Sequence, residues 1–425
     1  MEEKRYKVGG AGAIGILIVL SLLWMINYAD RSIISIALQS IKQAFNLTDA
    51  QAGLLPSMVQ LGVAILTLPV AIFGDRWARR KVIALMALIW SAFTFVTGVT
   101  VQFWQMLASR FMVGAGEAGY APVGQAWLGM SFPKSVRSLI MGIFYIFSPL
   151  GTALGVFVGG TILNATQNWR MPFYVFAVPG IILAIIVFFL QDYKVVKTGE
   201  RALNKAYFKD WGSIFKIKSF WFFTLSCVFL FFNVFAMLAW APSLAMRAYD
   251  MNPAAAGSAL GLVALVTILG PLGGFLADRL QKRTANGRPY LTILFGALFL
   301  VMEFATLFSI GLPFGVWITL YAFANLFYGL QFPIFLGLIQ DFTPARLRST
   351  SIGIQNVAGQ LLGAVWGSVI VGVISDSVGG GARGIQTGLI WTSAVGIIGI
   401  VMLVIMLKYY PSESAAVSDE VLAER

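Results

Sequence analysis

The sequence predicts an all-α membrane protein with twelve spanning helices, and three observations support this prediction. Of its 425 residues, 58% are hydrophobic and only 11% are charged, whereas a soluble protein averages about 25% charged residues. Apolar runs long enough to cross a bilayer recur along the whole chain. The Lys and Arg residues gather in alternate connections between these runs, which is the pattern of membrane topology. Together these observations argue against a soluble protein.

The apolar runs define the helices in order. We expect spanning helices at residues 12–40, 51–73, 81–101, 104–130, 138–164, 170–190, 219–246, 254–277, 289–310, 314–341, 349–375 and 386–408. The first run has no small-residue cleavage site at its end, so we interpret it as a retained helix rather than a signal peptide. An even number of helices places both termini on one side.

The basic residues indicate which side that is. The connections 74–81, 131–137, 191–218, 278–288 and 342–348, with the two tails, hold 24 of the 30 Lys and Arg residues. The opposite connections hold four, which are Lys42, Arg170, Arg247 and Arg383. The positive-inside rule therefore predicts that both termini are cytoplasmic. We expect an integral protein of the cytoplasmic membrane of a bacterium.

An internal repeat predicts two pseudo-symmetric six-helix bundles. Asp75-Arg76, with Arg79 and Arg80, is matched 203 residues later by Asp278-Arg279, with Lys282 and Arg283. Phe132-Pro133, with Arg137, is matched 211 residues later by Thr343-Pro344, with Arg348. The expected organisation is an N-terminal bundle at 1–190, a cytoplasmic linker at 191–218, a C-terminal bundle at 219–410 and a cytoplasmic tail at 411–425.

Composition also bears on chemistry. The chain has no His and a single Cys, Cys227, so it lacks the commonest metal ligand and cannot form an internal disulfide. No serine–base pairing or metal cluster is apparent, so we expect no enzyme activity, no cofactor and no metal site. The net charge is +12, but the basic residues lie in short connections, which does not predict nucleic-acid binding.

Four charged residues lie inside apolar segments, where each costs roughly 2.5–3.5 kcal/mol on insertion scales. They are Asp30 and Arg31 in the first helix and Arg110 and Glu117 in the fourth. Seven residues separate Arg110 from Glu117, so they share a helix face about 10 Å apart, too far for an ion pair with each other. We expect each to find a partner in Asp30 or Arg31, if the two helices face the same space.

Each of these residues has a structural and a functional interpretation. Asp30 is either locked in an ion pair or carries a proton whose affinity changes with conformation. Arg110 either reaches the headgroups from the helix end or binds the anionic part of a substrate. We assign proton coupling to Asp30 and Glu117, and anion binding to Arg31 and Arg110.

The sequence resembles the major facilitator superfamily in the Asp-Arg-x-x-Arg-Arg element at 75–80, although Ala71 and Ala78 stand where glycine is usual. Four further motifs resemble the Spinster-like transporters of that superfamily, with the anion:cation symporters as the competing resemblance. The resemblance implies a rocker-switch carrier with an aspartate at the position of Asp30 in coupling. The motifs are Asn27-Tyr28-Ala-Asp30-Arg31, Arg110-x6-Glu117-Ala-Gly, Phe132-Pro133, and Pro149-Leu-Gly151-Thr-Ala-Leu-Gly155 with Gly159-Gly160.

The second half holds fewer buried charges. Asn233 falls at the repeat position of Asp30, and Asn325 is a looser counterpart of Glu117. Glu303, in the ninth helix, is either a neutral acid buried against a neighbour or a lateral polar site. Aromatic side chains recur on one face of the tenth helix, where they either pack against neighbouring helices or line a binding pocket. The remaining candidates for substrate binding are Asn27, Tyr28, Tyr120, Phe144, Tyr145, Asn233, Tyr321, Asn325 and Tyr328.

The charged residues at the cytoplasmic helix ends are candidates for gating, because an acid at a helix end can pair with bases across the two halves. Their alternative role is to set topology. The gating candidates are Asp75, Arg76, Arg79, Arg80, Arg137, Asp278, Arg279, Lys282 and Arg348.

These features predict a proton-coupled carrier that moves an anionic amphiphile, such as a lysolipid or sphingolipid-like molecule. The alternatives are a proton symporter for a small organic anion, such as a sugar acid, and an uncoupled facilitator. Buried carboxylates argue against the facilitator, which has no use for titratable groups. The expected partners are membrane lipids, protons and the anionic substrate, and we expect a monomer.

Overall fold

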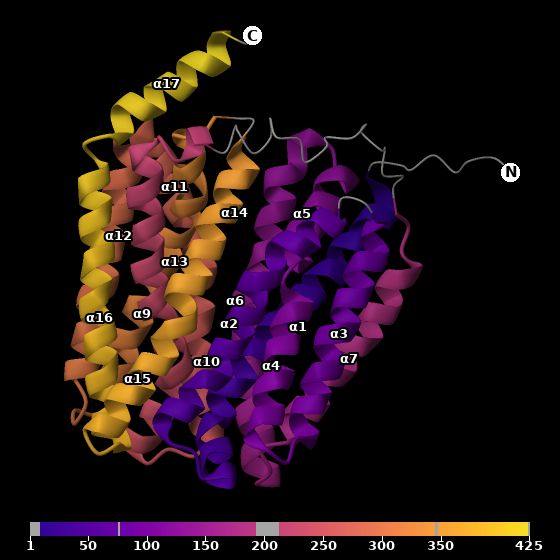
Figure 1. The fold of residues 1–425 in the computed structure, drawn as a ribbon, viewed down its shortest axis with the longest axis vertical. Helices are drawn as coiled ribbons and strands as arrows, with labels where there is room; N and C mark the ends of the chain where they lie inside the picture. Colours follow the sequence, from indigo (N-terminus) through magenta and orange to yellow (C-terminus); the bar gives the residue numbers. More distant parts are fainter. Residues whose placement is uncertain (1–8, 75–76, 193–211, 345–346, 424–425) are drawn as a thin grey trace, which may run out of the picture. The chain divides into compact units, whose positions relative to one another are not determined.

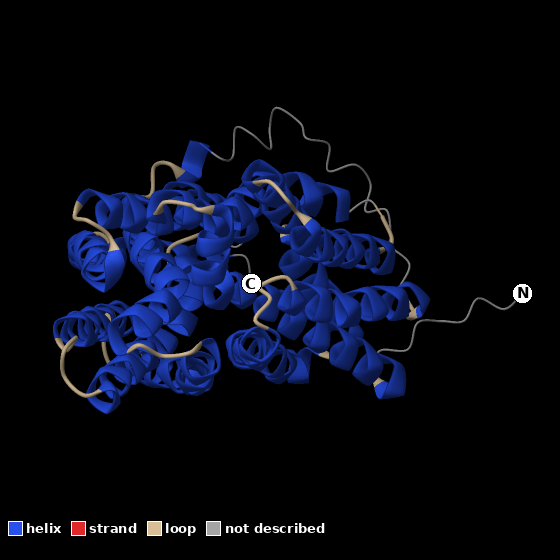
Figure 2. Ribbon diagram, turned by 90° about the horizontal axis from the view of Figure 1, so that it is seen from below, coloured by secondary structure: helices blue, strands red, loops and turns tan. Residues whose placement is uncertain are grey.

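A computed structural model describes residues 9–74, 77–192, 212–344 and 347–423. These residues form helices joined by short connections, and no strand is present among them (Figure 2). The chain divides into two compact units. Unit 1 comprises Met1–Thr198 and Ala239–Leu262, and unit 2 comprises Gly199–Leu238 and Val263–Arg425. Each unit is described by itself, and the division into two six-helix bundles stays a prediction.

Unit 1 contains the helices of the first half of the chain (Figure 1). They are α1 (Gly10–Phe45), α2 (Asp49–Gly74), α3 (Arg79–Val99), α4 (Phe103–Glu117), α5 (Tyr120–Ser131), the 3-10 turn η1 (Lys134–Val136), α6 (Arg137–Thr166) and α7 (Met171–Phe189). The C-terminal part of α9 (Lys218–Tyr249) and the N-terminal part of α10 (Pro253–Val266) also belong to unit 1.

Unit 2 contains the rest of α9 and the helices that follow α10 (Figure 1). They are the 3-10 turn η2 (Thr267–Leu269), α11 (Gly270–Gln281), α12 (Gly287–Phe308), α13 (Phe314–Asp341), α14 (Arg348–Ala358), the π-helical turn η4 (Gly359–Ala364), α15 (Val365–Ser377), α16 (Gly381–Met406) and α17 (Tyr410–Ala423). Helix α17 was expected only as a tail, because its apolar content is low.

Among the described residues, eleven helical segments are long and apolar enough to cross a membrane. The predicted span 104–130 is missing from this set because it is built from two shorter helices. Helix α4 ends at Glu117 and α5 begins at Tyr120, with a break at Ala118–Gly119. The predicted total of twelve therefore rests on counting α4 and α5 as one span, and the break follows directly on a buried carboxyl.

Two glycines set the contact between α1 and α6 in unit 1. A Cβ atom added at Gly151 would overlap the carbonyl oxygen of Met25, and one at Gly155 would overlap that of Ala29. Both glycines are four residues apart, as are the two carbonyls, so they repeat once per helical turn on one face. The backbones of α1 and α6 therefore touch over a full turn, which is the close packing that small residues permit in membranes.

The same contact recurs in unit 2. A Cβ atom at Gly363 would overlap the carbonyl oxygen of Val228, and one at Gly367 would overlap that of Phe232. Here η4 and α15 approach α9 as α6 approaches α1. The α9 carbonyls lie 203 residues after the α1 carbonyls. This is the offset that the sequence repeat predicted, so the residues that follow, Asp30 and Asn233, occupy equivalent positions.

Candidate functional site

Arg110 on α4 is a charged residue of unit 1 that is fully buried. Its Nη1 atom lies 3.5 Å from Oδ1 of Asp30 on α1. The other oxygen of Asp30, Oδ2, accepts a hydrogen bond of 2.6 Å from the hydroxyl of Thr94 on α3. The guanidinium also lies over the ring of Phe173 on α7, 5.9 Å from its centroid. Four helices therefore converge on this ion pair.

The second ion pair joins Arg31 to Glu117. The Nε atom of Arg31 donates to Oε2 of Glu117 over 2.7 Å. The side chain of Arg31 is 17% exposed, whereas that of Glu117 is fully buried. Arg31 also lies over the ring of Tyr28, 5.5 Å from its centroid. This pair is therefore the more accessible of the two, on its arginine side.

The spacing on the two helices explains this arrangement. Consecutive residues of α1 point about 100° apart, so Asp30 and Arg31 reach two different positions on α4. Glycines also let α4 pack closely against α2 and α3, which holds α4 in place. A Cβ atom at Gly114 would overlap the Val59 carbonyl of α2, and one at Gly116 would lie 2.6 Å from the backbone nitrogen of Trp90 on α3. The expected partnership of α1 and α4 charges is present in the structure.

Several polar atoms of this cluster are buried without a hydrogen-bond partner among the described residues. They are Nε and Nη2 of Arg110, Oε1 of Glu117, and both amide atoms of Asn27. Asn27 lies one turn before Asp30 and Arg31 on α1 and is fully buried. Buried polar groups in native proteins almost always have a partner, so these five atoms are available to bind a polar group that reaches the cluster.

The aromatic candidates in unit 1 surround Trp24 on α1. Tyr120 and Phe144 stack on Trp24 with centroids 5.6 Å and 5.2 Å away, and both are fully buried. The Tyr120 hydroxyl donates to the carbonyl of Leu20. Tyr145 accepts a hydrogen bond from Gln125, so its ring is also fixed. In this conformation Tyr120 and Phe144 are packing residues, and Tyr28 is the aromatic candidate that contacts a charged residue.

The candidates in unit 2 lie around Asn233 on α9. Its amide nitrogen donates to Oε2 of Glu303 on α12, and the hydroxyl of Ser393 on α16 lies 3.3 Å from its amide oxygen. Asn325 on α13 donates to the carbonyl of Tyr321 one turn earlier. Asn233 is therefore hydrogen-bonded to Glu303, whereas the side-chain amide of Asn325 is hydrogen-bonded within α13.

The aromatic stripe of α13 is mostly in contact with other rings. Tyr321 stacks on Trp317 with centroids 5.5 Å apart. Tyr328 lies 5.8 Å from Phe299 on α12 and 6.3 Å from Phe332. Tyr321 is buried and Tyr328 is partly buried. These contacts favour packing for Tyr321.

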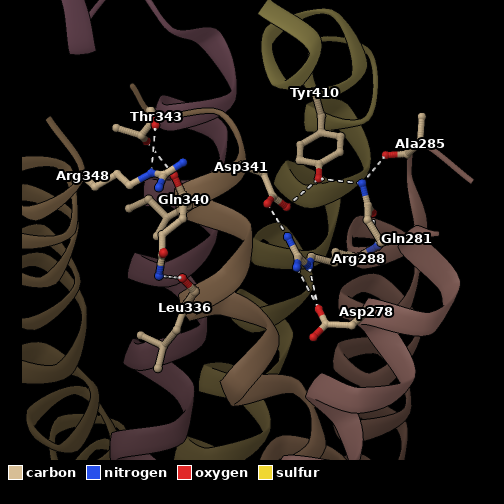
Figure 3. A network of polar contacts seen from close by, with 11 residues as sticks. Asp278, Gln281, Ala285, Arg288, Leu336, Gln340, Asp341, Thr343, Arg348 and Tyr410 are labelled. Carbon is tan, nitrogen blue, oxygen red and sulfur yellow. Dashed lines mark hydrogen bonds and ion pairs between the residues drawn. The ribbon is translucent and has the colours of Figure 1, made fainter. Parts of the chain in front are cut away.

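A polar network closes the predicted cytoplasmic end of unit 2 (Figure 3). Arg288 at the start of α12 bonds Asp278 of α11 through Nη2, over 2.8 Å, and through Nε, over 3.1 Å. It also pairs with Asp341 at the end of α13, and the Tyr410 hydroxyl donates to the other Asp341 oxygen over 2.7 Å. Gln281 joins Tyr410 to this network at 3.4 Å. Asp278 thus pairs with the next helix of its own unit.

The other gating candidates have local partners. Arg137 donates to the carbonyl of Phe132 over 3.2 Å, and Arg348 donates to that of Thr343 over 3.4 Å. The two matched motifs therefore make the same bond, from Nε to the carbonyl five residues earlier. The backbone N–H of Arg80 donates a hydrogen bond to Oδ2 of Asp192 over 3.2 Å. Asp75 and Arg76 lie outside the described residues, and among those described no ion pair involves Arg279 or Lys282.

Sequence reasoning missed a charged cluster at the opposite helix ends of unit 1. Asp49, the first residue of α2, is fully buried and pairs with Lys42 of α1 and Arg247 of α9. Two guanidinium nitrogens of Arg247 donate to it over 2.8 and 3.0 Å, and its Nε donates to Gln39 over 2.8 Å. From the sequence, Lys42 and Arg247 were expected only to mark the topology. The signal in the sequence was the acid Asp49, four residues after the end of α1.

The fold, the repeat and the intramembrane charges can now be compared with known proteins. The sequence matches the Major Facilitator Superfamily over residues 20–368. The chain belongs to the Major Facilitator Superfamily. It is therefore an integral membrane transporter, as the sequence predicted.

The similar proteins include several of Spinster type, which confirms the resemblance. The chain is 25% identical to the sphingosine-1-phosphate transporter SPNS2 of Xenopus tropicalis over 393 residues, which covers 88% of this chain and 75% of that protein. It is 25% identical to protein spinster homolog 1 of Xenopus laevis over 413 residues, with 90% and 78% covered.

Solved structures share the fold. A bacterial homologue of the human lysosomal transporter Spinster, in an inward-facing and occupied conformation, aligns with a TM-score of 0.80 at 19% identity. The alignment covers 95% of this chain and 99% of that one. A D-xylose–proton symporter aligns with a TM-score of 0.76 at 15% identity, covering 93% and 97%. These likenesses establish the fold of this major facilitator transporter.

Proposed function

We propose that this protein is a proton-coupled secondary active transporter that moves an anionic amphiphile, of lysolipid or sphingolipid type, by alternating access. The observation that carries the proposal is Arg110, a fully buried guanidinium with a long contact of 3.5 Å to Asp30 and two nitrogens that have no hydrogen-bond partner within the described part of the chain. A buried guanidinium with free donors is suited to a phosphate or carboxylate headgroup, which it binds through two parallel hydrogen bonds.

Proton coupling follows from competition for this guanidinium. When an anion binds Arg110, the guanidinium can no longer fully neutralise Asp30, and a proton on Asp30 restores neutrality. When the anion leaves, Arg110 returns to Asp30 and favours release of the proton. Glu117 and Arg31 form a second ion pair, about two turns further along α4, in which one carboxyl oxygen of Glu117 has no hydrogen-bond partner among the described residues. We assign coupling to Asp30 and Glu117.

The amphiphilic substrate is supported by two points. The sphingosine-1-phosphate transporter SPNS2 of Xenopus tropicalis is similar to this chain over most of its length, and its name indicates a phosphorylated lipid as the substrate of that protein. Arg31, which is partly exposed, and Asn27 extend the row of polar groups along α1 beside Arg110. A headgroup with several oxygens satisfies these donors together, whereas a monocarboxylate satisfies fewer of them.

The test is ligand stabilisation of the purified full-length protein. A ligand at a hundred times its dissociation constant stabilises the folded state by about 2.7 kcal/mol, so lysophosphatidic acid is expected to raise the melting temperature. Monoacylglycerol, which lacks the phosphate, is the matched negative probe, and small organic acids such as glucuronate test the alternative substrate class. Stabilisation by the small acids and none by lysophosphatidic acid would replace the amphiphile with a small anion.

Variants locate the binding site in the same assay. Arg110→Ala is expected to lose the stabilisation by lysophosphatidic acid. Arg170→Ala, which removes an arginine that bonds the Thr100 carbonyl at the predicted outer side of unit 1, is expected to keep this stabilisation.

In proteoliposomes, uptake driven by a pH gradient is expected to vanish in Asp30→Asn and Glu117→Gln. Unchanged driven uptake in both variants would exclude their role in coupling.

A further inference from the structure

Unit 2 contains a buried acid that the proposed mechanism does not use. Glu303 on α12 is fully buried, fifteen residues after Arg288. Its Oε2 atom accepts a hydrogen bond from the Asn233 amide on α9, and its Oε1 atom has no partner among the described residues. Three helices meet at this point, because Ser393 of α16 lies 3.3 Å from the Asn233 amide oxygen.

No cation neutralises this carboxyl within the described residues, none of which forms an ion pair with it. On its own helix, Arg288 is about 22 Å away at about 1.5 Å per residue. On α16, Arg383 lies ten residues before Ser393, about 15 Å along the helix. On α11, Asp278 and Arg279 lie at the predicted cytoplasmic end.

The remaining neighbours of Glu303 are neutral. Helix α9 presents Asn233 and α16 presents Ser393. On α13, Tyr321 is the titratable side chain that interacts electrostatically with Glu303. A phenol that is itself buried supplies no positive charge. The surroundings of Glu303 therefore differ from those of Glu117, whose charge is matched by Arg31 at 2.7 Å.

An isolated carboxylate in a low-dielectric interior costs several kcal/mol even after relaxation, and such groups take up a proton instead. The hydrogen bonds indicate where the proton sits. Asn233 donates to Oε2, so a proton taken up by Glu303 is expected on Oε1, on the side of the carboxyl that faces away from this donor. Protonation converts the Glu303 carboxylate into the neutral carboxylic acid, and no other bond forms or breaks.

We infer that Glu303, held by Asn233, is a second proton-binding site of this transporter, in unit 2 and separate from the two ion pairs of unit 1. The proton on Glu303 exchanges with solvent during the transport cycle. This exchange rests on the proposed proton-coupled transport, whereas the protonation of Glu303 in the present conformation does not.

Infrared spectroscopy of the purified full-length protein at neutral pH tests the site directly. The carbonyl stretch of a protonated carboxylic acid is expected in the unmodified protein and absent in Glu303→Gln. It is expected to persist in Asp30→Asn and in Glu117→Gln. Glu413→Gln, which alters a partly exposed glutamate that bonds the first backbone amides of α9, is the matched control and is expected to keep the band.

Two further measurements make the result decisive. Asn233→Leu removes the donor to Oε2, so the band is expected to move to higher frequency while Glu303 stays protonated. In heavy water under transport conditions, the band is expected to shift as the proton exchanges for deuterium. A band that survives Glu303→Gln, or that is absent in the unmodified protein, overturns the site. A Glu303 band that never shifts in heavy water overturns its part in transport while leaving the unit 1 mechanism intact.

Discussion

The two units carry different polar residues, with different partners, at equivalent positions of α1 and α9. Both helices pack against a partner through a pair of glycines one turn apart, with carbonyls at Ala29 and Phe232 in register. The next residue is Asp30 in unit 1, which meets Arg110 and Thr94. In unit 2 it is Asn233, which meets Glu303. The scaffold is repeated, whereas the charge chemistry is not.

This difference separates packing from function within one fold. The glycine contacts depend only on the absence of a side chain, so both copies keep them. Ion pairs in a membrane interior are costly, and a transporter needs them only where charge is bound or moved. Unit 1 keeps a permanent cation beside its carboxylates, so an anion can compete for it. Around Glu303 in unit 2 the described partners are neutral, so we expect this acid to hold a proton and not to compete for an anion.

The largest expected effect comes from removing the side chain at each equivalent position. Asp30→Ala leaves the guanidinium of Arg110 buried without a counter-charge, and this arginine cannot lose its proton. The free energy of unfolding is expected to fall by about 3–5 kcal/mol. Asn233→Ala leaves a neutral acid without its donor, which costs about 1–3 kcal/mol. Thermal unfolding of the purified variants measures both.

The double variant Asp30→Ala with Arg110→Ala provides the control for this comparison. Removing both charges abolishes the uncompensated guanidinium, so the double variant is expected to be more stable than Asp30→Ala while remaining inactive in driven uptake. Equal losses in Asp30→Ala and Asn233→Ala would mean that the ion pair carries no special energetic role, and that the two units are alike at this position.

The second effect concerns the shared scaffold. Gly155→Ala and Gly367→Ala each place a methyl group against a backbone carbonyl that cannot move far. Overpacking of this kind costs about 1–3 kcal/mol, and the two losses are expected to be similar because the contacts are repeated. Gly142→Ala on α6 is the control, since a Cβ atom there meets nothing within 4 Å. If only one of the two variants lowered the free energy of unfolding, the two glycine contacts would not contribute equally to stability.

Much of this architecture could be read from the sequence, because membranes impose simple rules. Apolar length and basic connections predicted the helices, and the 203-residue offset predicted that Asn233 matches Asp30. The helical distance between Arg110 and Glu117 predicted that each pairs with another helix. These inferences need only the geometry of one helix and the cost of burying charge.

Other features depend on which side chains meet across helices, and a single sequence does not give this. Asp49 joins residues from α1 and α9 that are distant in the chain. Tyr120 and Phe144 stack on Trp24, a contact that the sequence does not show, and their role in substrate binding stays a prediction. The break at Ala118–Gly119 divides a run whose composition predicted one helix. For Glu303 the sequence left open a neutral acid buried against a neighbour or a lateral polar site. It does not show that Asn233 of α9 lies beside this residue of α12.

The smallest expected effect lies at the predicted cytoplasmic ends, where unit 2 has the larger described network. Tyr410→Phe removes the hydroxyl that donates to Asp341, next to Arg288 (Figure 3). Loss of one hydrogen bond is expected to lower the free energy of unfolding by about 0.5–1.5 kcal/mol. Tyr409→Phe is the control, because the neighbouring Tyr409 ring stacks on Phe222 and keeps that contact without its hydroxyl.

The pH dependence of this loss follows from the state of the phenol. Burial, and then the charge of Asp341, raise the pKa of Tyr410 above its ordinary value, which is about 10 in an unfolded chain. The neutral phenol is therefore favoured by folding, and its contribution is complete below pH ~10 and lost only as the pH rises through the folded value. The difference between Tyr410→Phe and the unmodified protein is expected to stay constant from pH 6 to pH 8. A difference that changes across that range would contradict the assignment of this contribution to the neutral phenol.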